Sequence, residues 1–175
     1  SRLSARCASS FTSLRSLLVE IYPPNLEQEG LDQALSDMLA RVAAQGIEPH
    51  TDITLPDEPL EPETTALVYR CAQEAGRNVV RHAAADGVWL MIRPVDDRLV
   101  LEVSDDGRGL STQPGGGFGI KGMTERVRPM GGRISLTQRT DCSGLTLRAE
   151  IPLPPTAKGP VPPHDIKVVQ DIASK

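Results

Sequence analysis

The sequence predicts an α+β fold, in which a mixed, mostly antiparallel sheet is covered by helices on one face. Apolar residues recur at spacings of three and four in two N-terminal segments and in a longer segment that opens near Pro62. Short stretches of alternating apolar and polar residues predict strands, most of them joined by short turns as in hairpins. The predicted order is two helices, a strand, a helix, two strands, a short helix and a final hairpin.

Two helices are predicted before the first strand. The first carries one apolar stripe and ends at Pro23 and Pro24, because proline interrupts a helix. The second spans about residues 31–42 and stops near Gly46. The stripe of the first helix consists of Leu3, Cys7, Phe11, Leu14, Leu17, Leu18 and Ile21.

The central helix is the longest one that the sequence predicts. The stretch IEPHTDITL comes before it and predicts a first or edge strand, because Pro49 lacks the N–H that an inner strand uses. The helix opens near Pro62 and runs through TTALVYRCAQEAGRNVVRHAAA, with Glu61 and Glu63 suited to its N-terminus. Gly76 inside it costs about 1 kcal/mol relative to alanine. This glycine marks either a close approach of another segment or a tolerated defect.

The remaining strands follow the central helix. VWLMIR and RLVLEVS predict two strands joined by the turn PVDD, and GIKGMTERVRPMGG predicts a short helix closed by Gly131 and Gly132. RISLTQR and GLTLRAEIPL predict a hairpin across TDCSG. The proline-rich tail, residues 154–175, is expected to be mobile.

Composition restricts the class of protein. The 175 residues are 39% hydrophobic but only 3% aromatic, so the core must rest on aliphatic side chains. A net charge of −4 argues against nucleic acid as a partner. Three cysteines without paired spacing indicate reduced thiols and a cytoplasmic setting. No apolar run approaches the ~20 residues that a membrane helix needs, so no membrane contact by this segment is expected. The first residues look like the interior of a helix, so the chain is expected to be a piece of a longer protein.

The stretch SDDGRGL follows a predicted strand and spaces an acid and two glycines as D-x-G-x-G. Asp105 precedes Gly107 by two residues and Gly109 by four. A surface turn explains this pattern, because aspartate and glycine are turn residues. A nucleotide pocket also explains it, because glycine lets a flat ring approach the backbone and a carboxylate accepts a hydrogen bond from an adenine amino group.

A row of polar residues follows one face of the central helix. Glu74, Asn78 and His82 fall at successive i, i+4 positions, which places them on the same side. A carboxylate, an amide and an imidazole beside an apolar stripe suit a magnesium–phosphate site, since the amide oxygen is a hard ligand for Mg²⁺. A solvated polar face is the alternative, and for this row taken alone it is the better one.

A second glycine cluster, GGGFGIKGM, runs directly into a predicted helix. Gly117, Gly119 and Gly122 leave the start of this helix bare, and Lys121 adds a positive charge. Free N–H groups at such a start favour an anion. A flexible linker is the alternative, although a linker does not need to continue into a helix, and neither the Rossmann nor the Walker pattern is present.

The three stretches together resemble a known family. QEAGRNVVRHA looks like the N box, DDGRG like the G1 box and GGGFGIKGM like the G2 box of the catalytic domain of sensor histidine kinases, which belongs to the gyrase, Hsp90, histidine kinase and MutL ATPases of the Bergerat fold. The wording GIKGMTERV is most similar to the NarL/DesK-like subfamily of two-component kinases.

The resemblance implies a division of the chain. Residues 47–153 would form the ATP-binding catalytic domain, and residues 25–46 a connecting helix packed on it. Residues 1–24 would be the end of a dimerisation and phosphotransfer helix, and residues 154–175 the tail.

The resemblance also implies roles for individual residues. Asn78 would ligate Mg²⁺, and Glu74 would be the acid that assists phosphotransfer and also reaches the metal through water. Asp105 would bind the adenine amino group of ATP. The other residues implied in nucleotide binding are Arg81, His82, Gly107, Gly109, Gly117, Gly119, Ile120, Lys121, Gly122 and Met123.

The implied activity is that of a histidine protein kinase. In a homodimeric parent, ATP would phosphorylate a histidine on the dimerisation helix, and a response regulator would then take the phosphoryl group onto an aspartate. His50, His82 and His164 are not in a phosphoacceptor motif, so this segment is expected to bind ATP without phosphorylating itself. The alternatives are an anti-sigma-factor serine kinase of the same fold and a non-catalytic nucleotide-sensing module.

Overall fold

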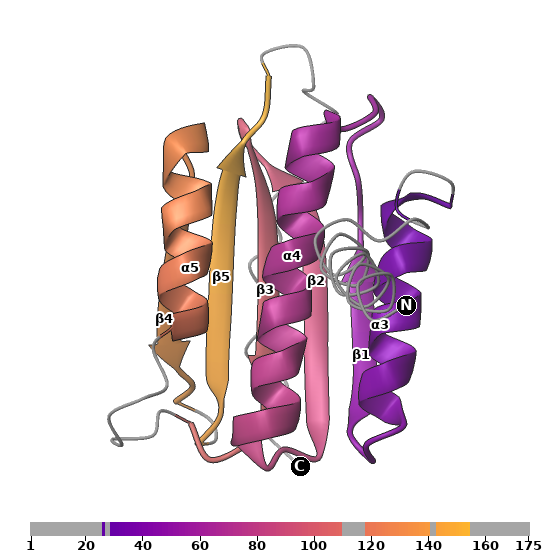
Figure 1. Ribbon diagram of the computed structural model, residues 1–175, viewed down its shortest axis with the longest axis vertical. Helices are drawn as coiled ribbons and strands as arrows, with labels where there is room; N and C mark the ends of the chain where they lie inside the picture. The colour runs from indigo at the N-terminus through magenta and orange to yellow at the C-terminus, as the bar shows by residue number, and fades with distance from the viewer. Residues whose placement is uncertain (1–25, 27–28, 110–117, 141–142, 155–175) are drawn as a thin grey trace, which may run out of the picture.

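A five-stranded sheet in the order β1-β2-β3-β5-β4 is covered on one face by the helices α3, α4 and α5 (Figure 1). This computed structural model describes residues 26, 29–109, 118–140 and 143–154. The predicted segment 1–24 and nearly all of the tail 154–175 lie outside the described residues. In the part that is described, no helix is both long and apolar enough to cross a membrane.

The elements follow the predicted order. The strands are β1 Glu48–Ile53, β2 Gly87–Val95, β3 Arg98–Asp105, β4 Arg133–Gln138 and β5 Leu145–Pro152. The helices are α3 Gly30–Ala43, α4 Pro62–Asn78 and α5 Phe118–Val127, with a π-helical turn at Val79–Ala83 and a 3-10 turn at Arg128–Met130.

Strand pairing confirms the predicted fold class of a mixed, mostly antiparallel sheet. The edge strand β1 runs parallel to β2, with Glu48 opposite Gly87, and α4 forms the crossover between them. The other pairs, β2·β3, β3·β5 and β4·β5, are antiparallel. Pro49 lies in β1, at the edge where a missing N–H is tolerated, as the sequence predicts.

The core lies between the sheet and the helices and is almost entirely aliphatic. Strand β2 alternates in burial, with Val88, Leu90 and Ile92 turned toward the helices and at most 1% exposed. Helix α4 meets them with Val68 and Ala72, which are fully buried. The low aromatic content of the sequence is thus matched by a core of packed Leu, Val, Ile and Ala.

The end of the central helix differs from the prediction of one continuous α-helix. The α-helical hydrogen bonding of α4 stops at Asn78, and a π-helical turn follows from Val79 to Ala83. Ala84 then takes a left-handed conformation with φ of 50°, which ends the helix. Helical periodicity does not distinguish an α turn from a π turn, which is why the sequence did not indicate this change.

Gly76 lies in the middle of α4, on the side that faces α3. A Cβ added here would lie 3.6 Å from Sδ of Met38 and 3.7 Å from Cγ2 of Val42, which is ordinary van der Waals contact. The close approach that the sequence offered as one explanation is therefore present, but it leaves room for a methyl group.

We expect Gly76→Ala to raise the free energy of unfolding by about 0.5–1 kcal/mol, because alanine costs less backbone entropy in a helix than glycine. Urea unfolding of the two proteins, followed by circular dichroism, measures the difference. A variant less stable than the wild type would show that the contact between α3 and α4 has no space for the methyl group.

Candidate functional site

Helix α4 presents the predicted polar row along one side. Glu74 and Asn78 are partly buried, and His82, in the π-helical turn, is exposed. The Glu74 carboxylate lies 3.3 Å from the Arg77 guanidinium, one turn further along the helix. The row is therefore half sheltered by neighbouring structure, unlike a fully solvated helix face.

The first turn of α5 packs directly on Glu74. A Cβ added to Gly119 would overlap Oε1 of Glu74, so any larger residue here would require the Glu74 side chain to move. The glycine of the predicted G2 box and the acid of the predicted N box are thus in contact. Two of the three motifs meet at this point.

The turn after β3 packs against the π-helical turn at the C-terminal end of α4. The backbone N–H of Arg108 donates to the carbonyl oxygen of Ala83 at 2.8 Å, and Nε of Arg108 donates to the carbonyl oxygen of His82 at 2.6 Å. A Cβ on Gly107 would collide with that same Ala83 carbonyl. The predicted G1 box is thereby held against the π-helical turn, so the G1 and G2 boxes both contact the N-box stretch between Glu74 and Ala83.

Asp105 ends β3 with its side chain turned inward and only 6% exposed. Its Oδ1 accepts a hydrogen bond from the backbone N–H of Gly107 at 2.9 Å. Burial raises the pKa of Asp105, and the backbone N–H groups of Gly107 and Leu145 lower it only in part, so the net pKa is raised. A carboxylate accepts up to about four hydrogen bonds, so beyond those from the backbone N–H groups of Gly107 and Leu145 it retains acceptor capacity for a ligand.

The glycines of the G1 box make room for the protein's own backbone. Gly107 admits the Ala83 carbonyl, and Gly109, with φ of 73°, lies where a Cβ would collide with the carbonyl of Ser143. The sequence analysis had assigned this space to an adenine ring. The described contacts explain both glycines without a ligand, and a role beside the base stays a prediction.

Asp106 is a structural residue of the site that the sequence analysis did not single out. Its Oδ1 accepts hydrogen bonds from the backbone N–H groups of Asp86 and Gly87, each at 3.0 Å. These bonds join the loop before β2 to the end of β3. The doubled aspartate in SDDGRGL was the available signal, since short acidic side chains often hold loop amides.

The remaining predicted nucleotide-binding residues are spread over different environments. Met123 is 3% exposed and belongs to the hydrophobic core, and Ile120 packs against it. Lys121 is exposed, and a Cβ on Gly122 would meet nothing within 4 Å. Arg81 is exposed and lines a groove that α4 forms with α3, and Gly117 lies outside the described residues.

The donor set suits a metal that is held mainly by phosphate. Among the described residues, no group of three His, Cys, Asp or Glu side chains could hold an ion by itself. Mg²⁺ is usually bound by one or two protein oxygens together with substrate phosphates and water. Asn78 and Glu74, one helical turn apart on a partly buried face, fit that mode of binding.

Comparison with known proteins identifies the family. Residues 63–155 match the model of the histidine kinase-, DNA gyrase B-, and HSP90-like ATPases. The chain is 34% identical over 132 residues to the signal transduction histidine-protein kinase/phosphatase UhpB of Salmonella typhimurium, and 28% identical over 144 residues to the oxygen sensor histidine kinase NreB of Staphylococcus carnosus. These matches cover 73% and 80% of this chain but only 26% and 41% of the two relatives.

Solved structures agree on the fold. The histidine kinase domain of the Erythrobacter litoralis EL346 blue-light activated histidine kinase superposes with a TM-score of 0.57 at 22% identity, over 70% of this chain and 59% of that one. Full-length ShkA in complex with AMPPNP gives 0.59 at 22% identity, over 73% of this chain and 30% of that one. The chain belongs to the histidine kinase-, DNA gyrase B- and HSP90-like ATPase family, as the catalytic, ATP-binding domain of a two-component sensor histidine kinase. The resemblance seen in the sequence is thus confirmed.

We expect Gly107→Ala to lower the free energy of unfolding by about 2 kcal/mol or more, because the methyl group collides with a backbone carbonyl that cannot move aside alone. Gly122→Ala is the matched control within the motifs, since its methyl group enters open space in a helix and should stabilise by about 0.5–1 kcal/mol. Denaturant titration of both variants tests the pair. Equal stabilities of the two variants would contradict the proposed contact between the G1 turn and α4.

Proposed function

We propose that this domain binds Mg²⁺·ATP beside the partly buried row of α4 and presents the γ-phosphate to a histidine on a dimerisation helix. The observation that carries the proposal is the convergence of the three motifs on one helix: Gly119 against Glu74, and Gly107 and Arg108 against the π-helical turn. The family assignment supports nucleotide binding. The contacts described above support the roles proposed below for individual residues.

Asp105 is the residue proposed to recognise adenine. Its carboxylate is fixed by the Gly107 amide, so its acceptor direction is set before any ligand arrives. Because it is buried, water competes poorly for this acceptor. A 6-amino group donates to a carboxylate, whereas a 6-oxo group, as in guanine, does not, so the site should prefer adenine.

The phosphates are proposed to lie between α4 and the start of α5. The first N–H groups of α5 and the exposed Lys121 favour an anion there. Asn78 offers an amide oxygen to Mg²⁺, which neutralises charge on the β- and γ-phosphates as in other phosphoryl transfers. Arg81 and His82 are proposed to lie near the phosphates, with the exposed His82 following Asn78 on the same helix side.

Glu74 is proposed to act on the acceptor side of the transfer. Arg77 pairs with its carboxylate, and the backbone of Gly119 packs against it on the other side. From this position it can accept the proton that the acceptor imidazole carries on its non-attacking ring nitrogen, or hold the water that would complete the metal shell. Because Gly119 lies in the first turn of α5, the Glu74 carboxylate is next to the position proposed for the phosphates.

The parent protein is proposed to complete the reaction. A histidine of the dimerisation helix would take the γ-phosphoryl group, and a response-regulator aspartate would receive it next. If transfer went instead to a serine of a partner, or did not occur, the serine kinase or the non-catalytic module would be the correct description. Phosphate that is labile in acid and stable in base, in a longer form with the upstream helix, identifies the histidine route.

Calorimetric titration of Mg²⁺·ATP into the wild type and Asp105→Asn tests the adenine contact. Asparagine has one oxygen and an NH2 group in place of two oxygens. If the oxygen keeps the Gly107 N–H, the NH2 group faces the adenine amino group, and two donors oppose each other. We expect at least a tenfold loss of affinity, about 1.4 kcal/mol. Asp52→Asn, on the exposed part of β1, is the matched control and should bind as the wild type does.

Acidification should weaken binding through the same carboxyl group. The pKa of Asp105 is raised, so the carboxyl group becomes protonated, and loses acceptor capacity, at a higher pH than an ordinary aspartate. The added loss of affinity should be absent in Asp105→Asn. Equal affinities of folded wild type and variant at neutral pH would place adenine elsewhere.

A further inference from the structure

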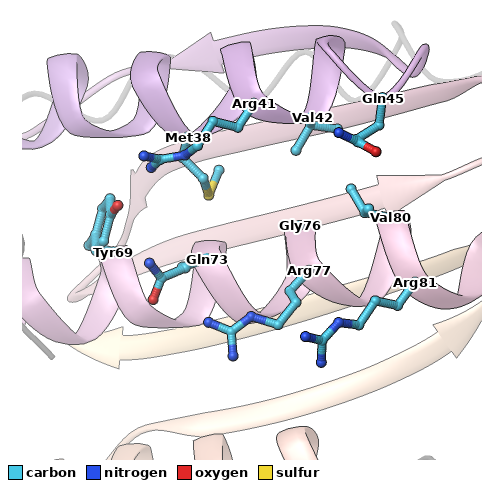
Figure 2. A pocket seen from close by; sticks show the side chains of 10 residues that line it. All are labelled: Met38, Arg41, Val42, Gln45, Tyr69, Gln73, Gly76, Arg77, Val80 and Arg81. Atoms are coloured by element: carbon cyan, nitrogen blue, oxygen red, sulfur yellow. The ribbon is translucent and has the colours of Figure 1, made fainter. Parts of the chain in front are cut away.

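A groove runs between α3 and α4, on a different side of α4 from the one that Gly119 contacts. It has a volume of about 440 Å³ (Figure 2). None of the ten lining residues belongs to the three motif contacts described above, although Arg77 also pairs with Glu74. The groove is lined by Met38, Arg41, Val42, Gln45, Tyr69, Gln73, Gly76, Arg77, Val80 and Arg81.

The charged residues of this groove all have the same sign. Arg41 extends from α3, while Arg77 and Arg81 start beside the groove on α4 and their side chains run away from α3 (Figure 2). No acidic residue lines the groove. Arg77 is paired with Glu74, but within the described part of the chain no carboxylate lies within ion-pair distance of Arg41 or Arg81. Such a local excess of positive charge stands out in a chain whose net charge is −4.

The floor of the groove is apolar. Met38 and Val42 are 5% and 4% exposed and close its base, and Figure 2 shows the side chain of Val80 directed into the gap. Val80 is 39% exposed, one of two large hydrophobic side chains exposed to this extent in the described residues. Gly76 has no side chain to fill the space between these groups. An apolar floor with a basic rim, between two helices that lie side by side, has the shape that receives a third helix.

We propose that the groove between α3 and α4 is a docking site for an acidic amphipathic helix of a partner protein. The apolar stripe of that helix would contact Met38 and Val80, and its carboxylates would pair with Arg41. Arginine suits this role because its guanidinium binds a carboxylate through two parallel hydrogen bonds. The proposal goes beyond ATP binding, since it concerns a separate side of α4.

Charge disfavours the occupants that this chain could itself supply. The segment 1–25 carries Arg2, Arg6 and Arg15 against Glu20 alone, so it is basic like the groove. A second copy docked groove to groove would bring arginine against arginine. A partner with the opposite charge is the occupant that the groove complements.

The test uses a panel of acidic amphipathic peptides of about 18 residues, long enough to form helices alone, with fluorescent labels. A matching panel has the same apolar stripe but lysine in place of each acid. Binding to the wild type, Arg41→Glu and Arg128→Glu is followed by anisotropy at low and high salt. Arg128→Glu is the matched control, because it makes the same charge change on an exposed residue after α5 that does not line the groove.

We expect saturable binding of acidic peptides that weakens at least tenfold in Arg41→Glu and with added salt, but not in Arg128→Glu. The affinity of Arg41→Glu for Mg²⁺·ATP should equal that of the wild type. The docking proposal can therefore fail without the nucleotide proposal failing, and the reverse. The proposal is overturned if no acidic peptide binds, if lysine peptides bind equally, or if Arg41→Glu has no effect. Arg41-dependent binding of anionic phospholipid vesicles alone, or self-association lost in Arg41→Glu, would replace it with a membrane or a second copy.

Discussion

The carbonyl oxygen of Ala83 fixes the arrangement on which the site depends. It accepts the backbone N–H of Arg108, and it occupies the position that a side chain of Gly107 would need. Nε of Arg108 adds a second bond to the neighbouring His82 carbonyl. These carbonyls lie at the end of a helix, where no further turn satisfies them. The end of the central helix and the turn after β3 therefore satisfy each other's backbone groups.

The fold places every motif within reach of this helix. Because α4 is the crossover between the parallel strands β1 and β2, its C-terminal end leads into β2, next to the end of β3. Helix α5 lies on one flank of α4 and α3 on the other (Figure 1). One flank carries the contact between Glu74 and Gly119, and the other carries the basic groove. The central helix thus separates the proposed nucleotide site from the proposed docking site.

Much of this could be predicted from the sequence, because periodicity reports burial. The alternation of VWLMIR and the stripe of α4 place Leu90 and Val68 in the core, as found. The hydrogen bonds of Arg108 and Asp106 could not be predicted, because they join segments that are far apart in the sequence. The π-helical turn was missed because helical periodicity does not distinguish it from an α turn. The sequence also did not predict why residue 107 is glycine. The spacing D-x-G-x-G indicates that space is needed there, but not that the Ala83 carbonyl occupies it.

Amide hydrogen exchange with and without Mg²⁺·ATP tests the central claim, that the three motifs form one site on α4. The account predicts that nucleotide slows exchange together at 78–83, at 105–109 and in the first turn of α5, while exchange in β1 and α3 stays the same. Protection of one of these segments alone, or protection centred on the groove beside α3, would contradict it.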